Sequence, residues 1–193
     1  MFTGIVETVG TVLDVSASGS NLSFRIRSGI SSELKPDQSV AHDGACLTVE
    51  EVVGDTHRVT AIRETLAKTV LGDWRPGRRV NLERSMVLGG RIDGHLVQGH
   101  VDTTGTCTGL QAMDGSTELG FSFPEAFAHL VIEKGSICIN GISLTAFSVS
   151  QDRLSVAVIP YTWAHTAIAD VQVGSKVNLE FDMLGKYVAR LRG

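Results

Sequence analysis

The sequence predicts an all-β protein built from two similar domains, each with about six short antiparallel strands arranged as a barrel or a sandwich. Two observations predict this class. Runs rich in Val, Ile and Thr are short, and turn residues separate them every ~8–12 positions. No strand alternates with a long helical pattern, which a doubly wound parallel sheet requires. Closing each set of strands would remove the exposed edges that promote aggregation, which favours the barrel.

An internal repeat defines the two domains. The frame Gly-x-(Cys/Ser)-Leu-Thr occurs at residues 44–48 and again, 97 positions later, at 141–145. Val80-Asn81-Leu82-Glu83 returns unchanged 97 positions later, and the stretch 4–11 returns in similar form 95 positions later. Because several matches keep one order and nearly one offset, they indicate a duplication. Each copy has about 95 residues, a common size for an independent domain.

The repeat sets the expected boundaries. We predict a first domain over residues 1–88, a second over 89–182, and a C-terminal oligomerisation helix over 183–193. The linker is expected within 86–94, which contains three glycines.

Composition excludes several classes of protein. The 193 residues are 42% hydrophobic and 20% charged, with a net charge of −4, so no basic surface for nucleic acid or for an anionic membrane is expected. No apolar run reaches the ~20 residues of a membrane span, and the start lacks the pattern of a signal peptide. Three cysteines without a C-x-x-C pair predict a cytoplasmic chain with free thiols.

Local signals place the strands of the first copy. Strands are expected over 2–15 and 22–28, separated by a turn at Gly19-Ser20-Asn21. The stretch 29–38 is expected to be a loop. Two further strands lie within 39–53 and are divided by the hairpin dipeptide Asp43-Gly44. A strand over 58–62, one or two helical turns over 63–71 and a strand over 79–84 complete the copy.

The second copy repeats this order. Strands are expected near 95–108, 117–123, 136–149, 153–159 and 175–182, with short helices near 124–131 and 163–169. In the tail, Leu184, Tyr187, Val188 and Leu191 share one helical face. A helix this short needs a partner surface in water. That surface is either its own barrel or another copy of the chain.

Some kinds of chemistry have no support in the sequence. Neither a P-loop nor a Gly-x-Gly-x-x-Gly turn is present. His95 and His100 are five positions apart on an expected strand, so they would point to opposite faces, and no metal site is expected. Residues 141–145 nearly match the nucleophile elbow Gly-x-Ser-x-Gly, but the fifth residue is Thr and no long helix follows.

The repeat also doubles a set of hydroxyl groups beside glycines. Thr48 and Thr65 in the first copy correspond to Thr145 and Thr162 in the second. Threonine is common in strands, so one such residue alone would mean little. Two related sets suit a flat heteroaromatic ring, whose edges bind backbone groups and whose polyol chain binds hydroxyls.

Five segments together resemble riboflavin synthase, over essentially the whole chain. They are Met1-Phe2-Thr3-Gly4-Ile5-Val6-Glu7, Ala41-His42-Asp43-Gly44-Ala45-Cys46-Leu47-Thr48-Val49, Glu64-Thr65-Leu66, Gly94-His95-Leu96-Val97-Gln98-Gly99-His100-Val101 and Asn140-Gly141-Ile142-Ser143-Leu144-Thr145. The resemblance implies two six-stranded Greek-key barrels and a homotrimer held by C-terminal helices. It implies a cofactor-free dismutation of two 6,7-dimethyl-8-ribityllumazine molecules into riboflavin and 5-amino-6-ribitylaminouracil by transfer of a four-carbon unit.

The resemblance also implies roles for individual residues. His100 is the expected general acid or base. Cys46 and Ser143 would add to the ring or activate a nucleophile, and Thr145 and Asp182 complete the catalytic set. The implied substrate-binding residues are Phe2, Gly4, Ile5, Val6, Ser39, Cys46, Leu47, Thr48, Thr60, Ala61, Ile62, Arg63, Glu64, Thr65, Gly99, His100, Val101, Lys134, Ser143, Leu144, Thr145, Ala157, Val158, Ile159, Pro160, Tyr161 and Thr162.

Alternative readings stay open at this point. Each named side chain has a purely structural reading, such as a buried small Cys46 or a Phe2 that plugs a barrel. Asn140 stands where some members carry aspartate, and asparagine cannot act as a base. The main functional rival is a non-catalytic lumazine- or flavin-binding antenna protein of the same fold. The sequence tells neither which barrel holds the donor nor whether the chain associates with lumazine synthase.

Overall fold

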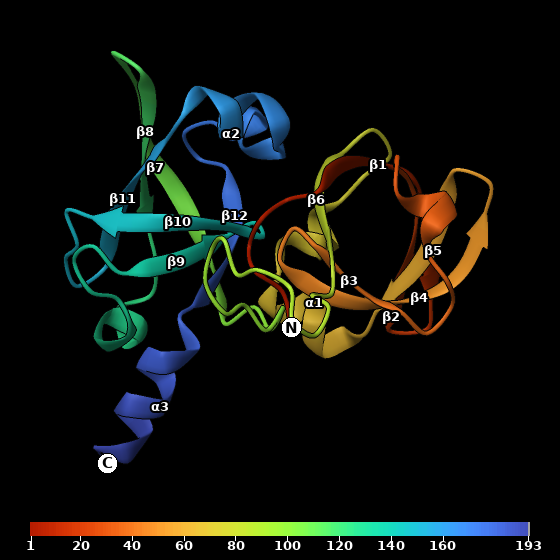
Figure 1. Cartoon of the computed structure of the whole chain (residues 1–193), viewed down its shortest axis with the longest axis horizontal. Coiled ribbons are helices and arrows are strands. Elements are labelled where there is room, and N and C mark those ends of the chain that lie inside the picture. Colours follow the sequence, from red (N-terminus) through yellow and green to blue (C-terminus); the bar gives the residue numbers. More distant parts are fainter. Residues whose placement is uncertain (193) are drawn as a thin grey trace.

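The computed structural model describes residues 1–192 and consists of two closed six-stranded antiparallel barrels lying side by side (Figure 1). The first barrel has the strand order β1-β2-β5-β4-β3-β6. Its strands are β1 (Thr8–Ser18), β2 (Asn21–Arg27), β3 (Ser39–His42), β4 (Ala45–Val53), β5 (Thr56–Ala61) and β6 (Arg79–Arg84). Short helices η1 (Ser31–Glu33), α1 (Arg63–Lys68) and η2 (Val70–Asp73) connect them.

The second barrel repeats this order as β7-β8-β11-β10-β9-β12. Its strands are β7 (Thr103–Met113), β8 (Ser116–Ser122), β9 (Ser136–Ile139), β10 (Ile142–Phe147), β11 (Arg153–Val158) and β12 (Lys176–Phe181). Its short helices are η3 (Glu125–Leu130), α2 (Pro160–His165) and η4 (Ala167–Asp170). The prediction of two tandem six-stranded barrels is confirmed, and the matching strand order agrees with a duplication.

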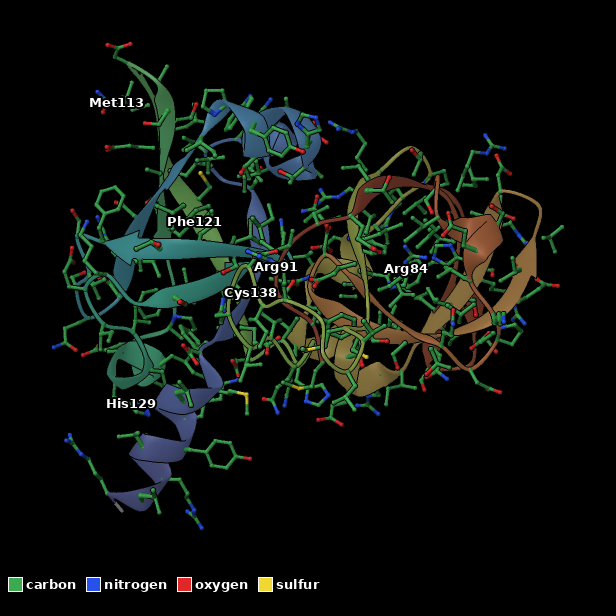
Figure 2. The ribbon with its side chains drawn as sticks, in the orientation of Figure 1. Arg84, Arg91, Met113, Phe121, His129 and Cys138 are labelled. Carbon is green, nitrogen blue, oxygen red and sulfur yellow. The ribbon has the colours of Figure 1, made fainter. Side chains whose placement is uncertain are left out.

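Period-two alternation explains how each barrel fills its interior. In β6, Val80 and Leu82 point into the first core, so Asn81 and Glu83 point outward, and β12 repeats this with its own Val-Asn-Leu-Glu. The cores are apolar, with Phe24 and Trp74 in the first barrel and Phe121 in the second, where Figure 2 labels it.

The predicted strands over 2–15 and 95–108 were too long at their starts. Residues 1–7, here called the first arm, and 96–102, the second arm, lie outside the barrels, and the N-terminus is seen between the barrels in Figure 1. The arms pair with each other through two hydrogen bonds between Phe2 and Val97. Gly4 and Gly99 then turn the chain with positive φ values of 75° and 80°, which glycine adopts without strain.

Three expectations for the second copy also change in detail. The predicted strand over 136–149 is a hairpin of two strands, because Asn140 and Gly141 both adopt positive φ. The predicted helix near 124–131 is the 3₁₀ helix η3, and the helix predicted near 163–169 begins earlier, at Pro160. Proline at a first helical turn is favoured because its fixed φ suits the helix and it has no N–H to satisfy.

Two buried asparagines join the barrels. The amide of Asn81 donates to the Asn140 carbonyl (2.9 Å) and its oxygen accepts from the Ala167 N–H (2.7 Å). Asn178 repeats this with the Asp43 carbonyl and the Val70 N–H, both at 2.8 Å. Gly44 and Gly141 meet at the same place, where a Cβ on either would lie 2.8 Å from the other's backbone nitrogen. These reciprocal contacts are those expected of two copies related by an approximate twofold axis.

The C-terminal helix α3 (Met183–Leu191) projects from the second barrel (Figure 1). Asp182 caps it by accepting a hydrogen bond from the Leu184 N–H at 2.9 Å. The predicted apolar face lies in solvent: Leu184 is 63%, Tyr187 62% and Leu191 86% exposed. Residue 193, the end of the predicted helix, lies outside the described residues. Among residues 1–192, no helix has the length and apolarity needed to span a bilayer.

A buried histidine pair distinguishes the first core from the second. His42 Nδ1 donates to the Val40 carbonyl (3.0 Å), so its Nε2 accepts from His57 Nε2–H (3.0 Å), and His57 Nδ1 accepts from the Ser31 hydroxyl (2.8 Å). Burial lowers the pKa of His42 to about 3 and that of His57 to about 4. The corresponding residues of the second barrel are the buried Ile139 and Leu154.

We expect this pair to make the first barrel acid-sensitive. Both rings must stay neutral when folded, whereas the unfolded chain takes up protons below pH ~6.5. The free energy of unfolding therefore loses up to about 1.4 kcal/mol per pH unit for each histidine as the pH falls from about 6.5 toward 4. The double variant H42I/H57L, which copies the second barrel, should lose this dependence in urea unfolding.

Comparison with the unchanged protein at each pH removes other contributions. Burial raises the pKa of Asp43 to about 6 and that of Glu180 to about 7, so these groups change stability in the opposite direction. They are present in both proteins and cancel in the difference. Parallel stability–pH curves for the two proteins would contradict the assignment.

Candidate functional site

The larger of two equivalent cavities opens on the second barrel and has a volume of about 650 Å³. Volumes of ~300–1,000 Å³ are typical of small-molecule sites. Eight predicted residues line it: Ile5, Lys134, Ser143, Leu144, Thr145, Ala157, Ile159 and Thr162. Ile5 comes from the first arm, so both halves of the chain build this cavity. Hydroxyl, ammonium and apolar groups together suit a ligand with a flat ring and a polar chain.

Sequence reasoning missed several residues of this cavity. Asp93 and Gly94 come from the linker, and Glu118, Ser136 and Phe147 come from three strands. The ammonium of Lys134 lies 5.3 Å from the centre of the Phe147 ring, within the range of a cation–π contact. Two of these residues could have been found from the predicted Thr145. Phe147 follows two positions later and so shares its face of the strand, and Ser136 is the register partner of Thr145 on the neighbouring strand.

Ser143 is paired with a histidine that the sequence did not assign. Its hydroxyl lies 2.7 Å from Nδ1 of His95, and the other ring nitrogen of His95 is buried without a hydrogen-bond partner. Burial lowers the pKa of His95, and the charge of Asp182 partly offsets this effect. A neutral imidazole beside a hydroxyl can accept its proton, which is the arrangement of an activated nucleophile. The sequence argument missed it because 95–102 was expected to be a strand.

The equivalent cavity on the first barrel is smaller, about 220 Å³. Six predicted residues line it: Cys46, Glu64, Thr65, Gly99, His100 and Val101. Ala45, Lys68 and Thr69 were not predicted. His100 is exposed and comes from the second arm, which places it over a barrel that does not contain it. Lys68 pairs with Glu64 at 3.4 Å on the exposed side of α1.

Other predicted residues lie outside these two cavities. Phe2 is fully buried between the halves with Val97, Ala41 and Cys138, beside Cys46, and Figure 2 labels Cys138 at this boundary. Ser39 lines a third cavity of about 620 Å³ beside the linker, and Asp182 lines a fourth, of about 610 Å³, between α3 and η3. The remaining predicted residues line neither of the two equivalent cavities. They are Gly4, Val6, Leu47, Thr48, Thr60, Ala61, Ile62, Arg63, Val158, Pro160 and Tyr161.

The two main cavities share a plan but differ in reactive groups. Ser143 with His95 stands in the second barrel where Cys46 stands in the first, and His100 stands where the first arm has Ile5. Among residues 1–192, no group of three or more His, Cys, Asp or Glu side chains could hold a metal ion.

Comparison with known proteins identifies the family. The lumazine binding domain model matches residues 3–85 and again 98–182. Riboflavin synthase of Mycobacterium tuberculosis (strain ATCC 25618 / H37Rv) is 40% identical over 196 residues, covering 99% of this chain and 98% of its own. Riboflavin synthase of Bacillus subtilis (strain 168) is 36% identical, covering 98% and 89%.

The chain belongs to the riboflavin synthase family. Each match of the domain model covers one barrel together with part of its arm. The family model and the structure therefore divide the chain into the same two repeats. Riboflavin synthase of Photobacterium phosphoreum is 33% identical over 193 residues.

Solved structures of another protein, LumP, have the same fold as this member of the riboflavin synthase family. The crystal structure of LumP complexed with riboflavin superposes with a TM-score of 0.88 over 94% of this chain and 99% of LumP, at 21% identity. LumP complexed with 6,7-dimethyl-8-(1'-D-ribityl) lumazine gives a TM-score of 0.85 at 20% identity. The two-barrel architecture therefore persists at low sequence identity.

We expect Gly94→Ala to disturb the larger cavity. A Cβ at Gly94 would collide with the Thr3 carbonyl oxygen and lie 2.8 Å from Ser143 Cβ. Such overpacking costs about 1–3 kcal/mol, which should appear as a lower free energy of unfolding in urea. Gly109→Ala is the matched control, because nothing lies within 4 Å of its Cβ position. Equal stability of the two variants would show that the contact at Gly94 is not tight.

Proposed function

We propose that this protein catalyses the riboflavin synthase reaction, in which two 6,7-dimethyl-8-ribityllumazine molecules yield riboflavin and 5-amino-6-ribitylaminouracil. Two observations carry the proposal. The chain has two equivalent pockets, each built from one barrel and the arm of the other half, and its relatives over nearly the full length are named riboflavin synthase. A reaction that joins two copies of one compound needs two similar sites.

The reaction sets different tasks for the two bound molecules. The donor loses a proton from its 7-methyl group, and the acceptor is attacked at ring carbon 7. Holding the two rings together supplies a proximity term of up to ~7–11 kcal/mol. Similar pockets with different reactive groups match this division, and no cofactor is required.

The reactive groups can be given roles within each pocket. In the second barrel, His95 accepts the proton of Ser143 as the hydroxyl attacks or activates a water. Thr145 lies beside Ser143 on the lining, and Asp182 acts through its charge on His95. In the first barrel, Cys46 lies with His100, which exchanges protons with the bound ring.

The remaining predicted contacts complete the substrate sites around these groups. Lys134, Thr162 and the backbone near Leu144 bind ring edges or ribityl hydroxyls in the larger pocket. The smaller pocket falls below the volume that encloses a whole ligand. Its substrate extends over the exposed neighbours Thr48, Ile62 and Arg63, and the facing barrel of another subunit covers it.

A non-catalytic antenna protein is the alternative, because LumP has the same architecture and its structures contain riboflavin, the lumazine or flavin mononucleotide. Higher identity to the synthases favours the enzyme, at 36% and 40% against 21%. One assay separates the two. Incubation with dimethylribityllumazine should produce flavin absorbance, whereas ligand binding without flavin formation would select the antenna.

We propose further that three copies assemble around their α3 helices in the cytoplasm. The exposed apolar face of α3 supports self-association, and free Cys46, Cys107 and Cys138 suit a reducing compartment. Lumazine synthase is a further partner that we propose for this assembly.

His100→Ala should lower kcat by roughly 10²–10⁴-fold, the usual contribution of a general acid or base. The side chain is exposed, so the free energy of unfolding should stay within about 0.5 kcal/mol of the unchanged protein. Steady-state flavin formation and urea unfolding are the two measurements. Unchanged turnover would remove His100 from the mechanism.

Removing residues 184–193 should give monomers with intact barrels and little activity, measured by sedimentation and by flavin formation. The deletion also removes Lys186, which pairs with Asp102 of the second arm at 2.7 Å. Tyr187→Ser/Leu191→Ser is therefore the control, since it changes only the exposed apolar face. Full activity in a monomer would contradict a site shared between subunits.

A further inference from the structure

The repeated Val-Asn-Leu-Glu segments end in two glutamates that line neither of the two equivalent pockets. Because valine and leucine fill the cores, Glu83 and Glu180 point out of their barrels toward the arms. The Glu83 carboxylate accepts from the Thr3 N–H (2.6 Å), the Thr3 hydroxyl (2.7 Å) and the Gly4 N–H (3.0 Å). Each barrel thus grips the arm that precedes it.

Glu180 grips the second arm in the same way. Its carboxylate accepts from the backbone N–H groups of Gln98 (2.6 Å), Gly99 (3.0 Å) and His100 (3.0 Å). One of the three donors is the His100 N–H. Glu180 therefore binds the backbone of the residue whose imidazole borders the first-barrel cavity. Three charge-assisted bonds to one carboxylate fix a short segment more firmly than neutral bonds would.

The far side of the same arm is tied to the other barrel. The Gly99 carbonyl accepts from the Cys46 N–H at 2.8 Å, and a Cβ on Gly99 would lie 2.6 Å from Cys46 Cβ. The arm therefore lies directly on Cys46. In the other half, the Gly4 carbonyl accepts from the Ser143 N–H at 2.7 Å. Any loosening of the second arm would move His100 and uncover Cys46 together.

We propose that Glu180 is a positioning residue for the first-barrel site: its carboxylate holds the second arm so that His100 lies over the pocket of Cys46. Glu83 does the same for the first arm, which carries Ile5 to the pocket of Ser143. The inference rests on the proposed function for its catalytic consequence and on geometry alone for its structural one.

The ionised form of Glu180 is the one that grips. All three partners are donors, and a protonated carboxyl would bring a hydrogen atom toward them. Burial raises the pKa of Glu180 to about 7, although its hydrogen bonds and Lys186 of α3 favour ionisation and Asp102 opposes it. The thiol of Cys138 also faces it; burial raises the pKa of this thiol well above its usual range, and the charges of Glu180 and Glu83 raise it further. The grip therefore strengthens as the pH rises through about 7.

Chemical labelling of Cys46 tests the grip without reference to catalysis. Glu180→Gln keeps the volume but turns one acceptor into a donor that faces the arm. We expect iodoacetamide to label Cys46 roughly tenfold faster in this variant at pH 8, because charge-assisted hydrogen bonds are lost. Peptide mass spectrometry follows each thiol, and continued protection of the buried Cys107 and Cys138 shows that the barrels remain folded.

Glu83→Gln is the matched control. It should leave Cys46 labelling unchanged, because Glu83 grips the other arm. Equal labelling in Glu180→Gln and the unchanged protein, or equal acceleration in both variants, would overturn the proposal. If Glu180→Gln fails to fold, hydrogen exchange at Gln98–His100 in the unchanged protein replaces it. Protection, corrected for intrinsic rates, must then rise between pH 6 and 8, and a flat profile overturns the grip.

The catalytic consequence is measured separately. In the unchanged protein, kcat for flavin formation should rise as the pH increases through about 7, because Glu180 ionises there. In Glu180→Gln this rise should be absent, and kcat should fall by a larger factor than KM rises. Glu180→Asp, which keeps the charge, should recover part of the rate. Faster labelling with an unaltered pH–rate profile would refute the positioning role. A protein that forms no flavin in any variant refutes the proposed function instead, and the labelling result stands by itself.

Discussion

The side chains of Asn81 and Asn178 hold the architecture together, because each one bridges the two barrels with a donated and an accepted hydrogen bond. Their partners are backbone groups, so the contact fixes the position of whole hairpins and helix starts. Buried polar groups are costly unless every one is paired. The contact therefore specifies a single docking arrangement, and the positions of both arms follow from it.

The approximate symmetry of that contact makes the differences between the halves informative. Asp43 and Asn140 occupy equivalent buried positions, and each accepts from a backbone N–H of the neighbouring last strand. Only Asp43 faces an arginine, Arg78, at 3.4 Å. The amide oxygen of Asn140 thus accepts from Asn178 within the second barrel, and its backbone carbonyl accepts from Asn81 of the first. An asparagine fills both positions without acting as a base.

Much of this plan was readable from the repeat. The offset of 97 aligned the hairpins at Gly44 and Gly141, and the tail pattern gave α3 and its apolar face. The arms were misread as strand because β-branched and apolar residues continue through 2–7 and 95–102. Strand propensity cannot report that two distant glutamates, rather than a neighbouring strand, satisfy those N–H groups. For the same reason the pairing of His95 with Ser143, 48 positions apart, left no local signal.

Exchange of the arms gives the duplication a physical meaning beyond the doubling of a pocket. A single barrel would keep Cys46 or Ser143 but would lack the residue that the other half places beside it. Each pocket is therefore complete only when the halves are docked. The first arm brings Ile5 to the pocket of the second barrel, and the second arm brings His100 to the pocket of the first. The salt bridge between Lys186 and Asp102 extends this dependence to α3. One ion pair thus joins the exposed helix to the arm that carries His100.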